Sequence, residues 1–195
     1  MNRMTRKTIA ATRIIHLFCS MLGVGAMVFF AATGFMLNNE TMFDLDGPDD
    51  NTVEMTLPAD MVRDARQETI VSHLRNTCGV TGLPDDFAVE EDMIELTFKR
   101  PGGRTDITIN RPGGEMEITT EPGSLTTVLL DLHRGANAGG IWGITIDLAA
   151  ICLLVACISG IVLWLAVPKR RMLGLIALLL GLLGWCGAYL FCVPK

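Results

Sequence analysis

The stretch that decides the fold is residues 141–167, IWGITIDLAAICLLVACISGIVLWLAV, in which Asp147 is the only charged residue. A helix needs about 20 apolar residues to cross the hydrocarbon core of a bilayer, so this stretch predicts a membrane-spanning helix. Two further stretches, residues 14–37 and 172–193, are also apolar. Apart from cysteines, the ionisable residue of the first is His16 and that of the second is Tyr189. We therefore predict an α-helical membrane protein with three transmembrane helices at residues 14–37, 139–167 and 172–193.

The basic residues predict the orientation of these spans. Arginine and lysine gather at the N-terminus, residues 1–13, and in the loop between the second and third spans, residues 168–171. Such residues next to spans stay in the cytoplasm, and three crossings put both clusters on that side. We therefore expect a bacterial inner-membrane protein whose residues 38–138 and C-terminus are periplasmic. A cleavable signal peptide is the alternative for the first span, but its length favours a retained anchor.

The segment between the first two spans is acidic. Residues 38–138 hold 20 acidic and eight basic residues, and this negative charge excludes nucleic acid as a partner. Its acidic turn at residues 44–51 has carboxylates but not the glycine and glutamate spacing of an EF-hand, so we interpret it as a linker and predict no metal site. Five of the six cysteines lie in spans, and no C-x-x-C pair is present, which excludes a thioredoxin-type redox motif.

Periodicity predicts one compact α+β domain at residues 38–122. Residues 59–76 repeat their apolar positions with the helical period. Alternating apolar and polar residues, separated by Pro-Gly-Gly turns, then predict an antiparallel meander of three or four strands. The clearest strands are residues 93–98, 105–110 and 116–120.

Residues 123–138 predict an amphipathic helix followed by a glycine-rich break. Ser124 is a favourable N-cap for a helix over Leu125–Arg134. The helix has one apolar face, and we expect it to lie in the outer membrane interface before the chain enters the second span.

The span motifs resemble the PepSY-associated transmembrane proteins, and the resemblance covers nearly the whole chain. Residues 13–38 are similar to the first helix of that family. The motifs similar to its second helix are Asp131-Leu132-His133-Arg134-Gly135, Trp142, Asp147, Ser159-Gly160, Leu163-Trp164 and Pro168-Lys169-Arg170-Arg171. The resemblance implies that residues 38–122 form a PepSY-like module. The family often has Leu-Asn-His after the first span, whereas this chain has Leu37-Asn38-Asn39, so one potential ligand is absent.

Larger relatives in this broad group are inner-membrane reductases of iron-siderophore complexes that carry b-type haem. The resemblance therefore implies haem b as a cofactor, His16 and His133 as its ligands, and Arg13 and Arg134 as partners of the haem propionates. A histidine near the membrane is costly unless it has a use, which agrees with this interpretation. A snorkelling His16 and a His133 that bonds a backbone carbonyl are the structural alternatives.

The positions of the two histidines across the membrane exclude one haem held by both of them. His16 lies near the inner face and His133 near the outer face, separated by about the ~30 Å thickness of the hydrocarbon core. Each needs a second ligand from another copy, another subunit or a methionine, so we expect a homo-oligomer or a membrane-complex subunit. Asp147 is a carboxylate inside the second span, and we expect a functional role or a bond to Thr145, Trp142 or a partner helix.

Two classes of function follow. The chain is either a redox component of an iron-acquisition system or a non-catalytic accessory subunit whose periplasmic module binds a partner protein. Inhibition of a peptidase is a third hypothesis, because PepSY modules also occur in protease propeptides. No nucleophile constellation is present, and the sequence leaves open whether the chain is an enzyme.

Overall fold

A computed structural model describes residues 3–43, 45–168 and 171–194. The predicted contributions of Asp44 to the acidic turn and of Lys169 and Arg170 to the basic loop lie outside these residues. The chain forms two compact units. The first consists of residues 1–27 and 147–195, and the second of residues 28–146.

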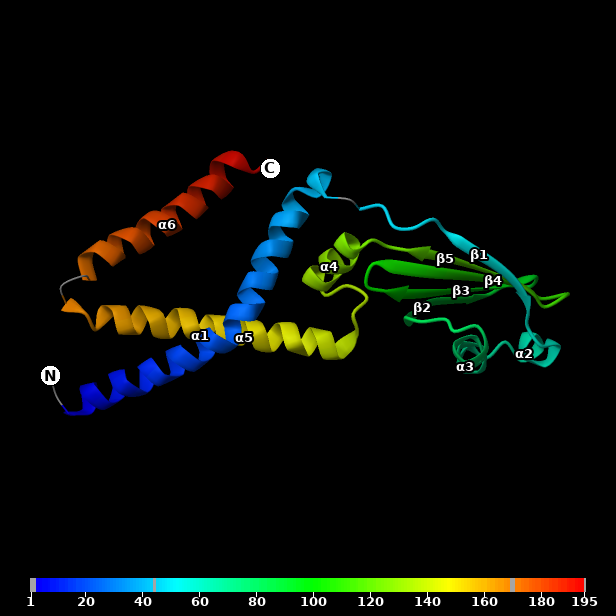
Figure 1. The fold of residues 1–195 in the computed structure, drawn as a ribbon, viewed down its shortest axis with the longest axis horizontal. Helices are drawn as coiled ribbons and strands as arrows, with labels where there is room; N and C mark the ends of the chain where they lie inside the picture. The colour runs from blue at the N-terminus through cyan, green and yellow to red at the C-terminus, as the bar shows by residue number, and fades with distance from the viewer. Residues whose placement is uncertain (1–2, 44, 169–170, 195) are drawn as a thin grey trace. The chain divides into compact units, whose positions relative to one another are not determined.

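Within the described residues, three helices are long and apolar enough to cross a membrane, as predicted (Figure 1). They are α1 (Arg3–Asn38), α5 (Gly139–Leu165) and α6 (Arg171–Cys192). Most of their large apolar side chains are exposed in the chain itself, which is the expected state of helices whose solvent is lipid. The chain is therefore a membrane protein, while its orientation stays a prediction.

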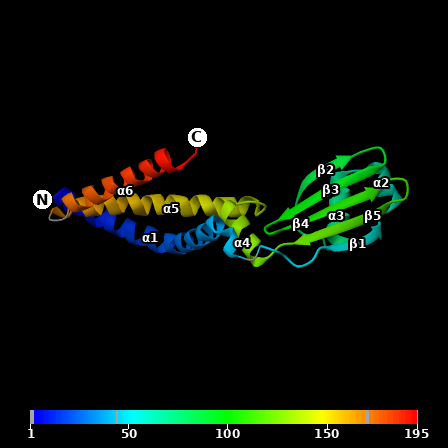
Figure 2. The ribbon, with the colours of Figure 1, turned by 90° about the horizontal axis from the view of Figure 1, so that it is seen from above.

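The second unit contains a five-stranded antiparallel sheet with the order β1-β5-β4-β3-β2 (Figure 2). The strands are β1 (Asn51–Thr56), β2 (Leu83–Val89), β3 (Met93–Arg100), β4 (Gly103–Asn110) and β5 (Glu115–Pro122). The three predicted strands correspond to β3, β4 and β5, which form the centre of the sheet. Tight turns connect them, so each strand pairs with its neighbour in sequence. We call residues 51–122 the sheet module.

The two edge strands, β1 and β2, were not among the three strands with clear alternation. All residues of β1 are exposed, and β2 has no buried residue. Strand β1 does alternate, with Val53 and Met55 between Thr52, Glu54 and Thr56, but it contains only two apolar residues. Residues 83–89 also contain Pro84, Asp85 and Asp86, which favour turns; the pairing of β2 with β3 shifts its register at this point.

The helix predicted at residues 59–76 is two helices, α2 (Ala59–Asp64) and α3 (Gln67–Thr77). Ala65 ends α2 in the left-handed conformation, with φ of 44°. This break lets both helices face the sheet. Val62 of α2 and Ile70 and Leu74 of α3 are buried.

The core of the sheet module lies between these helices and one face of the sheet. Strands β3, β4 and β5 bury alternate residues, as period-two alternation requires. The largest fully buried side chains of this core are Leu57, Ile70, Leu74, Ile94, Leu96, Phe98, Ile107 and Ile109.

Helix α4 (Leu125–Arg134) agrees with the predicted amphipathic helix. The side chain of Ser124 accepts a hydrogen bond from Thr127 N–H, and Gly135 ends the helix with φ of 70°. Its place in a membrane interface stays a prediction. Leu130 is its buried residue.

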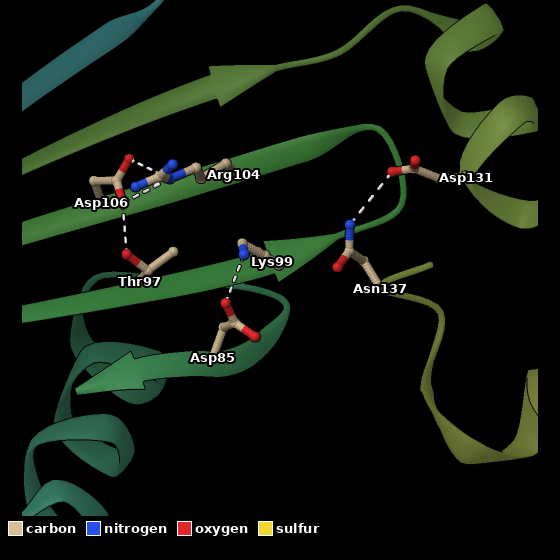
Figure 3. Close-up of polar contacts among 7 residues, drawn as sticks. All are labelled: Asp85, Thr97, Lys99, Arg104, Asp106, Asp131 and Asn137. Carbon is tan, nitrogen blue, oxygen red and sulfur yellow. Dashed lines mark hydrogen bonds and ion pairs between the residues drawn. The ribbon is translucent and has the colours of Figure 1, made fainter. Parts of the chain in front are cut away.

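The turn between β3 and β4 packs directly against α4. A side chain at Gly102 would lie 2.4 Å from a methyl carbon of Val128, so only glycine fits there. Gly102 N–H donates to Asp131 at 2.9 Å. Asn137 donates to the same carboxylate at 3.5 Å (Figure 3). Helix α4, which carries His133, is thus bonded to the sheet module.

Candidate functional site

His16 lies in α1 and is held by α5 within the first unit. Its Nδ1 is 2.9 Å from the carbonyl oxygen of Ala156 and 3.1 Å from the hydroxyl of Ser159. The Ser159 hydroxyl itself donates to the carbonyl of Val155 at 2.6 Å. Ser159 is only 6% exposed, so this polar group is buried among apolar helices and fully bonded.

These contacts define the tautomer of His16. A carbonyl oxygen can only accept, so the Nδ1 atom must carry the proton and donate it to Ala156. The Ser159 hydroxyl uses its own proton on Val155 and is therefore also an acceptor for Nδ1–H. In the neutral ring this leaves Nε2 without a proton, with its lone pair directed away from the bonded side.

His133 lies at the end of α4 and is held by α1 within the second unit. Its Nδ1 is 2.7 Å from the hydroxyl of Thr33, which is 2% exposed. The Thr33 hydroxyl donates to the carbonyl of Phe29 at 2.7 Å. With the single Thr33 proton donated to Phe29, Nδ1 of His133 is the donor to Thr33, although no carbonyl fixes this tautomer as Ala156 does for His16.

The end of α4 is fixed by neighbouring aromatic residues. The ring of His133 makes an edge contact with Phe30, with centroids 5.3 Å apart. The indole N–H of Trp142 donates to the carbonyl of Leu132, the residue before His133, at 2.9 Å. Contacts of the ring and of the neighbouring backbone therefore both fix the position of the imidazole.

Each histidine ring also lies against a glycine. A side-chain carbon at Gly160 would be 3.1 Å from Cε1 of His16, and one at Gly34 would be 3.3 Å from Cε1 of His133. Both distances are shorter than an ordinary carbon–carbon contact of about 3.5–4.0 Å. The absence of a side chain thus makes room for the imidazole.

The two sites therefore have the same composition. In each, a hydroxyl residue followed by glycine, Thr33-Gly34 or Ser159-Gly160, lies in a long apolar helix. The hydroxyl bonds a carbonyl four residues earlier in its own helix and accepts the Nδ1 proton of the histidine. We call each arrangement a histidine seat, one per unit.

The Nε2 atom of each histidine is free in the part of the chain that the structure describes. No hydrogen bond to either Nε2 is found among those residues. No fully buried side-chain nitrogen or oxygen there lacks a partner, so each Nε2 atom retains some exposed surface, and both histidines are partly buried. An imidazole oriented through Nδ1–H with an accessible Nε2 is the usual arrangement of a metal-ligating histidine.

The two arginines differ in their surroundings. Arg134 donates to the carboxylate of Glu40 at 3.1 Å, and both side chains are about half exposed. Arg13 is exposed and has no ion pair within residues 3–43, 45–168 and 171–194. The sequence did not predict the Glu40 pair, because 94 residues separate its partners.

Asp147 is exposed on α5, and neither of the two intrachain partners expected for it bonds it. Thr145 donates to the carbonyl of Ile141 at 2.9 Å, and Trp142 donates to Leu132. A partner helix or a functional role remains the prediction for this carboxylate.

Sequence reasoning named the two histidines but not the residues that hold them. Thr33-Gly34 and Ser159-Gly160 were visible only as family motifs, without a role. The signal that could have identified them is a hydroxyl residue inside an apolar span, where its hydrogen bonds must be made within the protein. Among the described residues, no group of three or more His, Cys, Asp or Glu side chains could hold a metal ion.

Comparison with known proteins gives one match. A family model described as PepSY_TM-like matches residues 8–194, which is nearly the whole chain and includes both histidine seats. No curated protein and no solved structure matches the chain.

Proposed function

The chain belongs to the PepSY_TM-like family, and from that premise we propose that it holds b-type haem through His16 and His133. Its role in this proposal is that of an inner-membrane component of an extracytoplasmic redox or iron-acquisition system. The observation that carries the proposal is the pair of histidine seats, in which Nδ1–H is bonded and Nε2 is accessible.

The residues of each seat fit a haem ligand. In both rings Nδ1 is bonded within the protein and Nε2 has no partner among the described residues. Here one nitrogen of each ring is fully engaged and the other is left for a ligand. The Nδ1–H bond to a carbonyl or hydroxyl also makes Nε2 a stronger donor to iron.

Other residues would support the bound group. When bound, haem supplies reversible one-electron transfer at its iron. Arg13 is free to neutralise a propionate, whereas Arg134 must share its charge with Glu40. The residue Asp147 has no assigned part in this proposal.

Each seat supplies one histidine, so a haem held there would need a further ligand from outside the seat. We propose that a second copy of the chain or another subunit provides it. A closed two-fold dimer would contain two copies of each seat, and therefore two copies of each histidine. The chain would then carry electrons only as part of such an assembly.

The test is haem content. The full chain is expressed with adequate haem, purified in neutral detergent, and its Soret absorbance is measured per mole of protein. His16→Ala and His133→Ala should each remove about half of the absorbance, since each seat is proposed to bind separately. The double variant should be colourless.

His73→Ala is the matched control, because His73 lies in α3 of the sheet module and should leave the absorbance unchanged. A colourless wild-type protein would refute the proposal. If that protein instead purifies with a stoichiometric partner, the accessory-subunit hypothesis replaces it.

A further inference from the structure

The two edges of the sheet differ in how they are protected against pairing with another strand. Edge β2 contains Pro84 and an irregular register beside it, and Asp85 forms an ion pair with Lys99. These are the usual features that prevent an edge from pairing. Edge β1 has six exposed residues, NTVEMT, with no proline, no bulge and Glu54 as its only charge.

Edge β1 also lies between two recesses. On the helix-covered face, Val53 is paired with Ile118 and Met55 with Met116, so these side chains share the core face. Val53 is nevertheless 43% exposed and Met55 38% exposed. A groove of about 230 Å³ lies beside them. Its lining includes Cys78 and Val80, which follow α3, and also the polar residues Thr81 and Arg100.

The open face of the sheet beside β1 is acidic. Glu54 is paired directly with Glu117 of β5, and Glu115 lies on the same face opposite Thr56. These three glutamates line a recess of about 490 Å³. Like charges directly opposite each other across two strands destabilise a sheet.

The basic residues on the open face of β3 and β4 are paired with aspartates, whereas Arg100, which lines the groove, donates to Thr81 and Arg111 donates to the carbonyl of Glu90. Arg104 is bonded to Asp106, which raises the pKa of this arginine, and Lys99 is paired with Asp85 (Figure 3). None of the ion pairs formed by the described residues involves Glu54, Glu115 or Glu117. The negative charge beside β1 is thus available to an incoming cation.

We propose that β1 is a docking edge for an extended segment of a partner protein in which basic and apolar residues alternate. The segment adds to the sheet as a sixth strand. Its apolar side chains enter the groove beside Val53 and Met55, and its lysine or arginine side chains lie against Glu54 and Glu117. This inference is independent of haem binding by His16 and His133.

A second copy of the chain fits the edge less well. Strand β1 has no basic residue, so pairing of two β1 edges would bring a second set of glutamates to the open face. The charge therefore favours a basic partner over self-association.

The test uses the full chain in neutral detergent and a synthetic eight-residue peptide of alternating lysine and valine, capped at both ends. Hydrogen–deuterium exchange of the chain is measured with and without the peptide. Alternate amides of an edge strand point outward, so about three of the six amides at residues 51–56 should gain protection. Residues 83–89 should gain none.

Three controls separate strand addition from simple charge attraction. Glu54→Lys should weaken peptide binding about fivefold or more, whereas Glu95→Lys should change it less than twofold. Glu95 lies on the same open face in the central strand β3. A peptide of equal charge with proline at its centre should not protect residues 51–56.

Equal effects of the two glutamate variants would overturn the proposal. Equal binding of the proline peptide, or protection at β2 rather than β1, would overturn it as well.

Discussion

The histidine seat around His16 makes a quantitative prediction for Gly160→Ala. A methyl group at this position would lie 3.1 Å from Cε1 of the imidazole, so the ring must move by about 0.5 Å to reach ordinary contact. The ring is bonded to Ala156 at 2.9 Å. Such a movement lengthens that bond beyond the usual upper limit of about 3.2 Å.

The matched control is Gly25→Ala, in the α1 segment of the same unit, where an added methyl group meets no atom within 4 Å. Replacing glycine by alanine in a helix stabilises it by about 0.8–1 kcal/mol. This gain is the same in both variants and cancels when their stabilities are compared. The variants then differ by the weakened Nδ1–H bond, about 1 kcal/mol. Gly160→Ala should therefore be about fivefold less favourable than Gly25→Ala in its folding equilibrium.

The assay is unfolding of the chain in neutral detergent by added dodecyl sulfate, followed by tryptophan fluorescence. Trp164 packs against Gly174 of α6, so separation of α5 from α6 changes its share of the emission, to which Trp142 and Trp185 also contribute. Nitrogen-15 spectra of the imidazole identify the Nδ1–H tautomer of His16 in each variant. Equal stability of the two variants, with an unchanged imidazole spectrum, would refute the seat as described.

Two further predictions concern the second unit. Thr33→Val removes the hydroxyl acceptor of His133, so it should destabilise the chain by about 1–3 kcal/mol and change the nitrogen-15 spectrum of that imidazole. Thr33→Ser should preserve both the stability and the spectrum. An unchanged spectrum in the valine variant would contradict the assigned bond. Burial raises the pKa of the Cys78 thiol, so folding favours its neutral form. The resulting contribution to the free energy of unfolding is complete below the ordinary thiol pKa and declines as pH rises above that value. Alkylation of Cys78, followed by mass spectrometry, should have its midpoint at higher pH in the folded chain than in the denatured chain, and coincident midpoints would exclude the burial effect.

The strands show which parts of the fold were predictable. Strands β3, β4 and β5 were found because one face of each is buried and the apolar residues must alternate. Strand β1 was missed although Val53 and Met55 alternate with polar neighbours, because two apolar residues make only a short pattern. The strand is exposed on both faces, and its place at the edge depends on pairing with β5.

The break at Ala65 was missed for a related reason. The apolar period continues through both helices, and alanine normally favours a helix. Its left-handed conformation lets α2 and α3 both cover the sheet, so packing against the sheet decided it.

The sequence by itself predicted three helices long and apolar enough to cross a membrane, and one acidic α+β module between the first two. Hydrocarbon favours long apolar helices and water favours charged residues, so the composition of each segment indicates its solvent. The sequence also proposed His16 and His133 as candidate ligands. Only the tertiary structure decided what holds them, because Ser159 lies 143 residues from His16 and Thr33 lies 100 residues from His133. Contacts at that separation depend on how the helices pack, and packing brings each imidazole against a hydroxyl and a glycine.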